Sequence, residues 1–427
     1  MIAAARGSNA VPFTLPARFL LTGAFALPIA FTLLAMRPEL LGAHYAAPSV
    51  LAFVHILTLG FASLIYVGAM HQLMPVLLNA PLYSLRLGSM SFCLLAAGSL
   101  GVVVGFALGF AVLPLAAGGI LAITGLLVFL SNILLTARQA PRLDSVSTAL
   151  IASATYLTLT AGLGTLLVLG RAIPEITATL GYATPLHLGL GLFGSFFLAI
   201  AGAGHKLLGM FVLAHGVTQT RVRIITWLVH AALALLFLET ALRISLGLAA
   251  GAVMVAAVAT YLYDVRVIIA RRARRVIERA MQHYLLAALF LPVAAGLALF
   301  GQTPAAAYAV LGGFITLAIA GMLVKIMSFL TWQHRYARKV GHEEVPMMRD
   351  MNRPALEAIS LFGLGLGAIL IVGAILWPTP VLATTAAALS AIGSWSLFAH
   401  LVWIVGARHR ARPQQRMSRE EPHVLPT

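Results

Sequence analysis

Long apolar stretches alternate with short polar connections along almost the whole chain. Each stretch is long enough for an α-helix to cross the ~30 Å hydrocarbon core of a bilayer. This pattern predicts an all-α integral membrane protein with twelve transmembrane helices. We place the spans at roughly 17–36, 48–78, 87–108, 111–136, 147–170, 182–214, 223–244, 247–269, 282–300, 304–333, 354–377 and 381–406.

Spans 2, 6 and 10 share a sequence pattern, which indicates an internal repeat. The pattern reads HILTLGFASLIYVGAMHQLMPVLL from His55, HLGLGLFGSFFLAIAGAGHKLLGMFVLAHG from His187 and YAVLGGFITLAIAGMLVKIMSFLTWQHRY from Tyr308. Each copy has a glycine near its middle, followed by a basic residue or histidine and then a methionine. These glycines are Gly68, Gly202 and Gly321.

A four-span period therefore occurs three times, in units of about 17–136, 147–269 and 282–406. Spans 4, 8 and 12 also end alike, in FLSNILLTARQAPRL, YLYDVRVIIARRARR and SWSLFAHLVWIVGARHRAR. We expect one transmembrane domain over 1–427, built from three pseudo-repeated four-helix arcs around spans 2, 6 and 10. Closely spaced glycines in spans 3 and 11 predict tight helix contacts there.

Composition excludes several classes of protein. With 61% hydrophobic and 9% charged residues, the chain is unsuited to a water-soluble fold. Its single cysteine, Cys93, excludes a disulfide within the chain, a CxxCH haem attachment site and a thiolate metal cluster. Phosphate-binding loops and zinc-protease motifs are absent from the sequence.

The positions of the basic residues predict the orientation of the chain. Of 28 lysines and arginines, only Arg37, Arg171 and Arg243 fall near loops after odd-numbered spans. The positive-inside rule then places both termini and the even-numbered loops in the cytoplasm of a bacterial-type inner membrane, with 407–427 as a basic tail. The net charge of +16 fits anionic lipid headgroups, and no folded basic domain suggests nucleic acid.

Two histidines within apolar spans are the main candidates for chemistry, because a polar ring in hydrocarbon needs a partner. His55 and His187 lie at similar depth near the outer ends of spans 2 and 6. Counted from the repeat glycines they differ by two residues, roughly 200° of rotation in a regular α-helix, so they can face each other across a shared space. We expect them to bind haem b or a metal. The alternative is two interfacial histidines bonded to carbonyl groups.

A second layer of candidates lies toward the cytoplasmic ends of the same helices. His71 and His205 lie about 24 and 27 Å deeper than the outer pair. With His215 and nearby methionines they suggest copper or an inner haem, although packing methionines and interfacial histidines would explain them too. Lys206 and Lys325 occupy matching repeat positions, where they either snorkel to the interface or bind propionate or anionic lipid.

The remaining charged residues near the spans read as structural. Glu239 and Arg243, four residues apart in span 7, are expected to form an ion pair on the helix surface. Asp264 and Arg266, at the end of span 8, are expected to be interfacial anchors.

Twelve helices in three arcs, with both termini inside and histidines at the outer ends of spans 2 and 6, resemble the haem-copper oxidase subunit I superfamily. His55 matches the span-2 histidine that ligates the low-spin haem there, and His187 stands in the span that carries a copper ligand. The chain departs from that family in reading HLGLG at His187, in having only His230 in span 7, and in carrying Tyr308 where span 10 should supply haem ligands.

The resemblance implies a haem b-binding membrane protein near the nitric oxide reductases and the haem- and copper-containing proteins of the nitric-oxide response. It would serve electron transfer or the handling of a small diatomic, as an oxidoreductase or with a redox partner, and without the standard oxygen-reducing centre. Two other functions remain open from the residues. One is a copper or small-molecule transporter with a His/Met-lined path, although transporters usually have two-fold repeats. The other is a cofactor-free assembly subunit.

Overall fold

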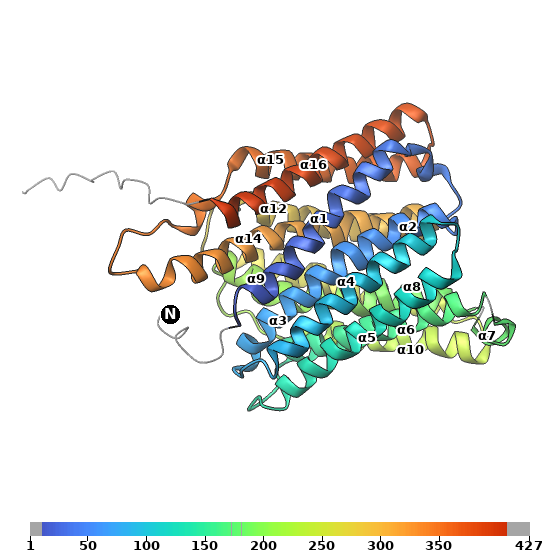
Figure 1. The fold of residues 1–427 in the computed structure, drawn as a ribbon, viewed down its shortest axis with the longest axis horizontal. Coiled ribbons are helices and arrows are strands. Elements are labelled where there is room, and N and C mark those ends of the chain that lie inside the picture. The colour runs from blue at the N-terminus through green and yellow to red at the C-terminus, as the bar shows by residue number, and fades with distance from the viewer. Residues whose placement is uncertain (1–10, 172, 181, 408–427) are drawn as a thin grey trace, which may run out of the picture.

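The computed structural model describes residues 11–171, 173–180 and 182–407, which form helices joined by loops (Figure 1). Twelve helical segments among them are long and apolar enough to cross a membrane. The predicted number and order of the spans are thus confirmed. The predicted basic tail lies outside the described residues, apart from Ala407.

Spans 2, 6 and 10 are composite, and the other spans are single helices. The single helices are α1 (Thr14–Met36), α4 (Leu85–Ala107), α5 (Val112–Ala137), α6 (Ser145–Leu169), α10 (Thr220–Leu242), α11 (Gly247–Ala270), α12 (Arg279–Leu299), α15 (Pro354–Leu376) and α16 (Pro380–Gly406). Short helices in the loops are η2 (Pro38–Gly42), α7 (Pro174–Leu180), η6 (Ala337–Lys339) and η7 (Met348–Met351).

Each composite span contains a π-helical segment between two α-helices. The parts are α2 (Pro48–His55), η3 (Ile56–Ser63) and α3 (Leu64–Leu78) in span 2, α8 (Thr184–Leu188), η4 (Gly189–Phe197) and α9 (Leu198–Phe211) in span 6, and α13 (Thr303–Tyr308), η5 (Ala309–Ile315) and α14 (Thr316–Arg335) in span 10. Hydrogen bonds in a π-helix reach five residues back. Side chains follow the same offset, since the Ser195 hydroxyl donates to the Leu190 carbonyl and the Thr316 hydroxyl to that of Leu311, both at 2.8 Å.

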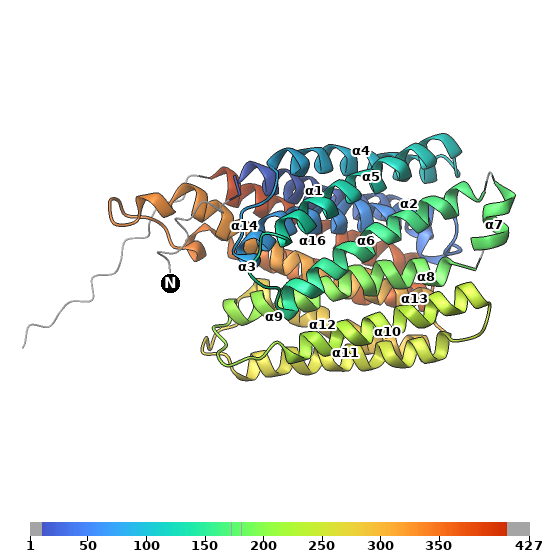
Figure 2. The same cartoon turned by 90° about the horizontal axis from the view of Figure 1, so that it is seen from below.

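Three antiparallel helix pairs, α4–α5, α10–α11 and α15–α16, form much of the outer wall (Figures 1 and 2). Small residues let two of these pairs approach closely, as predicted. A Cβ added at Gly98 would lie 2.7 Å from Ala122 Cα, and one added at Gly363 would lie 2.6 Å from Gly393 Cα. Side chains at these positions would therefore force the helix backbones apart.

The composite spans are among the most enclosed parts of the bundle. Buried residues make up 78% of the most apolar window of span 10, 61% in span 2 and 56% in span 6, a share that span 11 equals. The repeat glycines lie where each composite span meets the span that precedes it. Gly68 packs on Phe19, Gly202 on Ala149, and Gly321 on His283.

We call the end of the bundle that carries the loops after even-numbered spans the basic face, and the other end the opposite face. Figure 1 shows the basic-face end of α14 and the segment after it projecting beyond the other helices, with α7 at the opposite face. Near the basic face, a buried polar residue in spans 4, 8 and 12 bonds the start of the preceding span. These contacts are Asn132 Oδ1 with Ser84 N (3.0 Å), Asp264 Oδ1 with Arg221 Nε (2.6 Å), and His400 Nε2 with Arg353 N (3.1 Å).

Candidate functional site

His55 and His187 lie at the points where spans 2 and 6 change from α- to π-helix. His55 is the last residue of α2, directly before η3, and His187 lies in α8, two residues before η4. The fold places the His187 ring within electrostatic range of the His55 ring. The sequence pattern predicts that the two rings can face each other, but the rotation behind that prediction assumes a regular α-helix, and the π-helical segments have more residues per turn than it allows.

Both rings are held by the same kind of hydrogen bond. His55 Nδ1 lies 2.7 Å from the Leu51 carbonyl oxygen, and His187 Nδ1 lies 3.1 Å from that of Thr160. Because a carbonyl can only accept, each Nδ1 carries the proton and each Nε2 keeps its lone pair. Neither Nε2 has a hydrogen-bond partner among the described residues, and neither is fully enclosed. Metal-binding histidines are usually fixed in this way.

The walls around the pair are aromatic or small. The Phe106 ring lies 4.8 Å from the His55 ring, between centroids, and packs in turn on Phe110, which carries the Arg171 guanidinium on its face at 3.8 Å. His187 packs on Gly164 of α6, where an added Cβ would come within 2.8 Å of the imidazole Cε1. A larger residue at 164 would therefore displace the His187 ring.

The part of α6 beside His187 is only partly covered by other helices. Every residue from Leu159 to Leu169 keeps accessible surface, so no face of this half of the helix is fully covered by protein. In a membrane, lipid would cover the side of a span that faces away from the other helices.

The inner candidates do not join this pair. His71 is fully buried, its Nδ1 bonds the Val67 carbonyl at 2.8 Å, and its Nε2 has no partner in the described chain. His215 is exposed in the loop after α9. Lys206 is exposed, while Lys325 pairs with the Glu278 carboxylate and lies over the Phe211 ring. Within the described ranges, no group of three or more His, Cys, Asp or Glu side chains has the geometry of a metal site.

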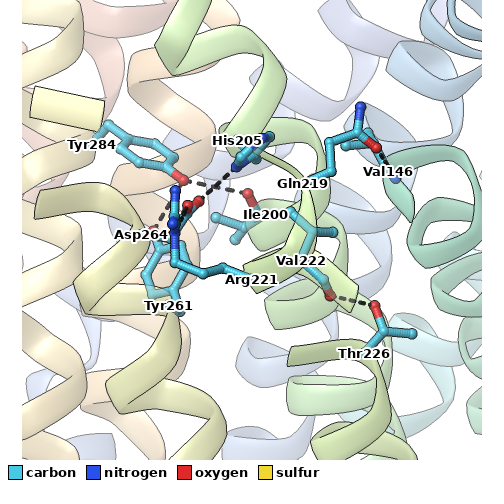
Figure 3. Close-up of polar contacts among 10 residues, drawn as sticks. All are labelled: Val146, Ile200, His205, Gln219, Arg221, Val222, Thr226, Tyr261, Asp264 and Tyr284. Carbon is cyan, nitrogen blue, oxygen red and sulfur yellow. Dashed lines mark hydrogen bonds and ion pairs between the residues drawn. The ribbon is translucent and has the colours of Figure 1, made fainter. Parts of the chain in front are cut away.

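Asp264 is not an interfacial anchor. It is 2% exposed and accepts hydrogen bonds from His205 Nδ1 at 2.8 Å and Arg221 Nε at 2.6 Å (Figure 3). Sequence analysis missed this cluster because its members come from three different spans. The alignment of FLSN, YLYD and LFAH in spans 4, 8 and 12 could have marked position 264 as a repeated polar site.

The expected ion pair in span 7 is also absent from the described residues. Arg243 adopts a left-handed conformation at the end of α10 and donates to the Ala178 carbonyl of α7 at 2.9 Å. One carboxylate oxygen of Glu239 is buried without a partner. The helix ends at Arg243, so the regular four-residue spacing assumed for the pair does not apply.

The sequence matches no family model, and a comparison with characterised proteins likewise finds no relative. The structure itself shows a helical protein with twelve described segments long and apolar enough to cross a membrane.

Proposed function

We propose that this protein binds haem b near its opposite face, between spans 2 and 6, and that His55 and His187 are the residues that would hold it. The supporting observation is the pair itself: two neighbouring imidazoles on different helices, each with Nδ1 bonded to a carbonyl and a free Nε2. An iron ligated by two imidazoles needs these two lone pairs. Gly164 leaves the space that the His187 ring occupies, so the ring keeps its place beside α6.

Bound there, the haem would supply one-electron chemistry, and handling of a diatomic such as nitric oxide would require one of the two histidines to give up its place. The protein would supply the rest. The Leu51 and Thr160 carbonyls would fix the tautomer and direction of the two rings, and Phe106 would shield His55 from water. The function that follows is electron transfer or diatomic handling within the membrane.

The proposal includes a haem-copper oxidase-like architecture of three repeated units. It is supported by the π-helical segments in spans 2, 6 and 10, the three outer helix pairs, and the equivalent polar contacts of Asn132, Asp264 and His400. It also takes the basic face to be cytoplasmic, because the lysines and arginines concentrate there.

Matched glutamine variants test the ligand assignment. We expect His55→Gln and His187→Gln, purified after haem-replete expression, to lose most of their haem and the sharp reduced α and β bands. His71→Gln is the control, because His71 lies on the same span as His55 and also bonds a carbonyl, but has no second imidazole opposite it.

Haem content per chain and elution as a single species should be measured for all three variants. A full haem complement with an unchanged spectrum in His55→Gln or in His187→Gln would refute the assignment. Metal analysis of the same samples distinguishes haem binding from copper binding, because the two free imidazole nitrogens would also suit copper. Stoichiometric copper without haem would favour the copper-binding function.

A further inference from the structure

A buried cluster near the basic face joins three spans of the second unit. His205 of α9 and Arg221 of α10 both bond the carboxylate of Asp264 in α11, and His205 and Asp264 are 7% and 2% exposed (Figure 3). Tyr261 donates its hydroxyl hydrogen to Tyr284 at 3.0 Å, and both phenols lie within electrostatic range of Asp264. The cluster belongs to no part of the proposed haem site.

The hydrogen bonds fix where a proton can be added. Asp264 already accepts from the Arg221 guanidinium, so it is the carboxylate that accepts and His205 Nδ1 that donates. In the neutral ring, Nε2 then keeps its lone pair. This atom has no hydrogen-bond partner in the described chain and is not fully enclosed. A proton added at Nε2 would therefore break no existing hydrogen bond and would place the new charge beside a carboxylate.

The other buried histidines near the basic face do not combine a partner-free, incompletely enclosed Nε2 with a neighbouring carboxylate. His71 Nε2 is enclosed, and no carboxylate contacts that ring. His283 Nε2 lies 3.2 Å from the Ser360 hydroxyl, and His400 Nε2 accepts the Arg353 backbone N–H. A proton added at His400 Nε2 would break its bond, because a backbone N–H cannot accept, and a proton added at His283 Nε2 would require the Ser360 hydroxyl to rotate from donor to acceptor.

The charges around the ring leave Asp264 as its counter-ion. Arg221 faces the cluster from α10 and shares Asp264 with His205. Lys206, next in sequence, is exposed and interacts with Asp144 at the start of α6. On α14, Lys325 faces α9 through Phe211 but pairs with Glu278. With neutral His205, the contacting triad is uncharged, and protonation would give it a single positive charge.

We infer that His205 and Asp264 form a site that takes up one proton from the basic face. The step is the addition of a proton from water to the Nε2 lone pair, which gives an imidazolium held by Asp264, and it needs no electron and no further reactant. Arg221, which lies in the first turn of α10, is 17% exposed in its side chain, whereas the Asp264 side chain is 3% exposed, so the cluster approaches the surface at Arg221. An ionisable group inside a membrane protein often serves this purpose.

Solid-state nitrogen-15 NMR of histidine-labelled protein in lipid bilayers tests the inference. Subtracting the spectrum of His205→Gln isolates the His205 signals at about pH 8 and about pH 5. We expect a neutral ring with a protonated Nδ1 at the higher pH and a doubly protonated ring at the lower pH. His283→Gln is the control, and its subtraction should reveal no charged ring.

Two further variants separate proton uptake from a purely structural role. Asp264→Asn keeps an oxygen acceptor, and asparagine stands at the equivalent position 132, so the fold should persist. Loss of the negative charge should lower the charged-to-neutral ratio of His205 at the lower pH by at least about tenfold. Arg221→Gln should raise that ratio. A His205 ring that stays neutral at both pH values, or a ratio unchanged by Asp264→Asn, would overturn the inference, whether or not the protein binds haem.

Discussion

At the scale of single residues, four histidines within spans share one hydrogen-bonding state. His55, His71, His187 and His205 all have Nδ1 bonded to an oxygen acceptor. What distinguishes them is the surroundings of Nε2. In the outer pair Nε2 belongs to a ring with a second imidazole nearby, in His71 it is enclosed, and in His205 it belongs to a ring that contacts a carboxylate. The same residue type in the same tautomer can thus serve different chemistry.

Asp144 gives a residue-scale prediction outside the spans. Its carboxylate accepts from the Ser147 backbone N–H at 2.8 Å and from the Gln219 amide at 2.9 Å, which caps α6 and ties it to the loop before α10. Burial raises the pKa of Asp144, but these hydrogen bonds lower it more, so its pKa lies below the usual 3.8. We expect Asp144→Ala to reduce the free energy of unfolding at neutral pH by about 1 kcal/mol.

The sign of the pH dependence follows from the lowered pKa. The folded state favours the charged form of Asp144. Its stabilising contribution is therefore complete above the pKa of the unfolded chain and is lost as the pH falls through the lower pKa of the folded protein. Thermal unfolding in detergent at neutral and acidic pH should show the wild type and Asp144→Ala converging in acid. Asp144→Asn keeps a hydrogen-bond acceptor, so its free energy of unfolding at neutral pH should fall less than that of Asp144→Ala. A constant difference between the wild type and Asp144→Ala at all pH values would contradict this account.

At the scale of helices, the π-helical segments position the outer candidates. His55 and Tyr308 are each the last residue before such a segment, and His187 comes shortly before one. Glycine-rich apolar sequence revealed that these spans were alike, but helical periodicity alone did not predict the change of helix type. These segments also pack closely on neighbouring helices, as at Gly313, where an added Cβ would overlap the Phe290 ring of α12. Such contacts lie far apart in sequence.

Close packing of small residues gives a prediction for the helix pairs. Gly98→Ala should lower the free energy of unfolding by about 1–3 kcal/mol, because its Cβ would overlap the α5 backbone at Ala122. Gly251→Ala in α11 is the matched control, since nothing lies within 4 Å of an added Cβ there. Unfolding temperatures of the two variants should be compared in the same detergent. Equal temperatures would mean that the α4–α5 contact is looser than the structure indicates.

At the scale of the whole molecule, short-range sequence patterns predicted the spans but not the contacts between residues far apart in the sequence. Apolar windows located all twelve spans, and the shared spelling of spans 2 and 6 singled out the outer histidines. Asp264 was misread because its partners, His205 and Arg221, lie 59 and 43 residues away, and no local pattern links them. From sequence alone, a charged residue at the end of an apolar span is expected at the membrane interface. Only the packing of the other spans shows that it is buried.

The most direct test of the central claim is the ultraviolet-visible spectrum of the purified wild-type protein, oxidised and then reduced with dithionite, after haem-replete expression. The account predicts about one haem b per chain, with the sharp reduced α and β bands of an iron held by two imidazoles. A pure, monodisperse protein without haem absorption would contradict it. His55 and His187 would then be two neighbouring membrane histidines without the cofactor that we assign to them.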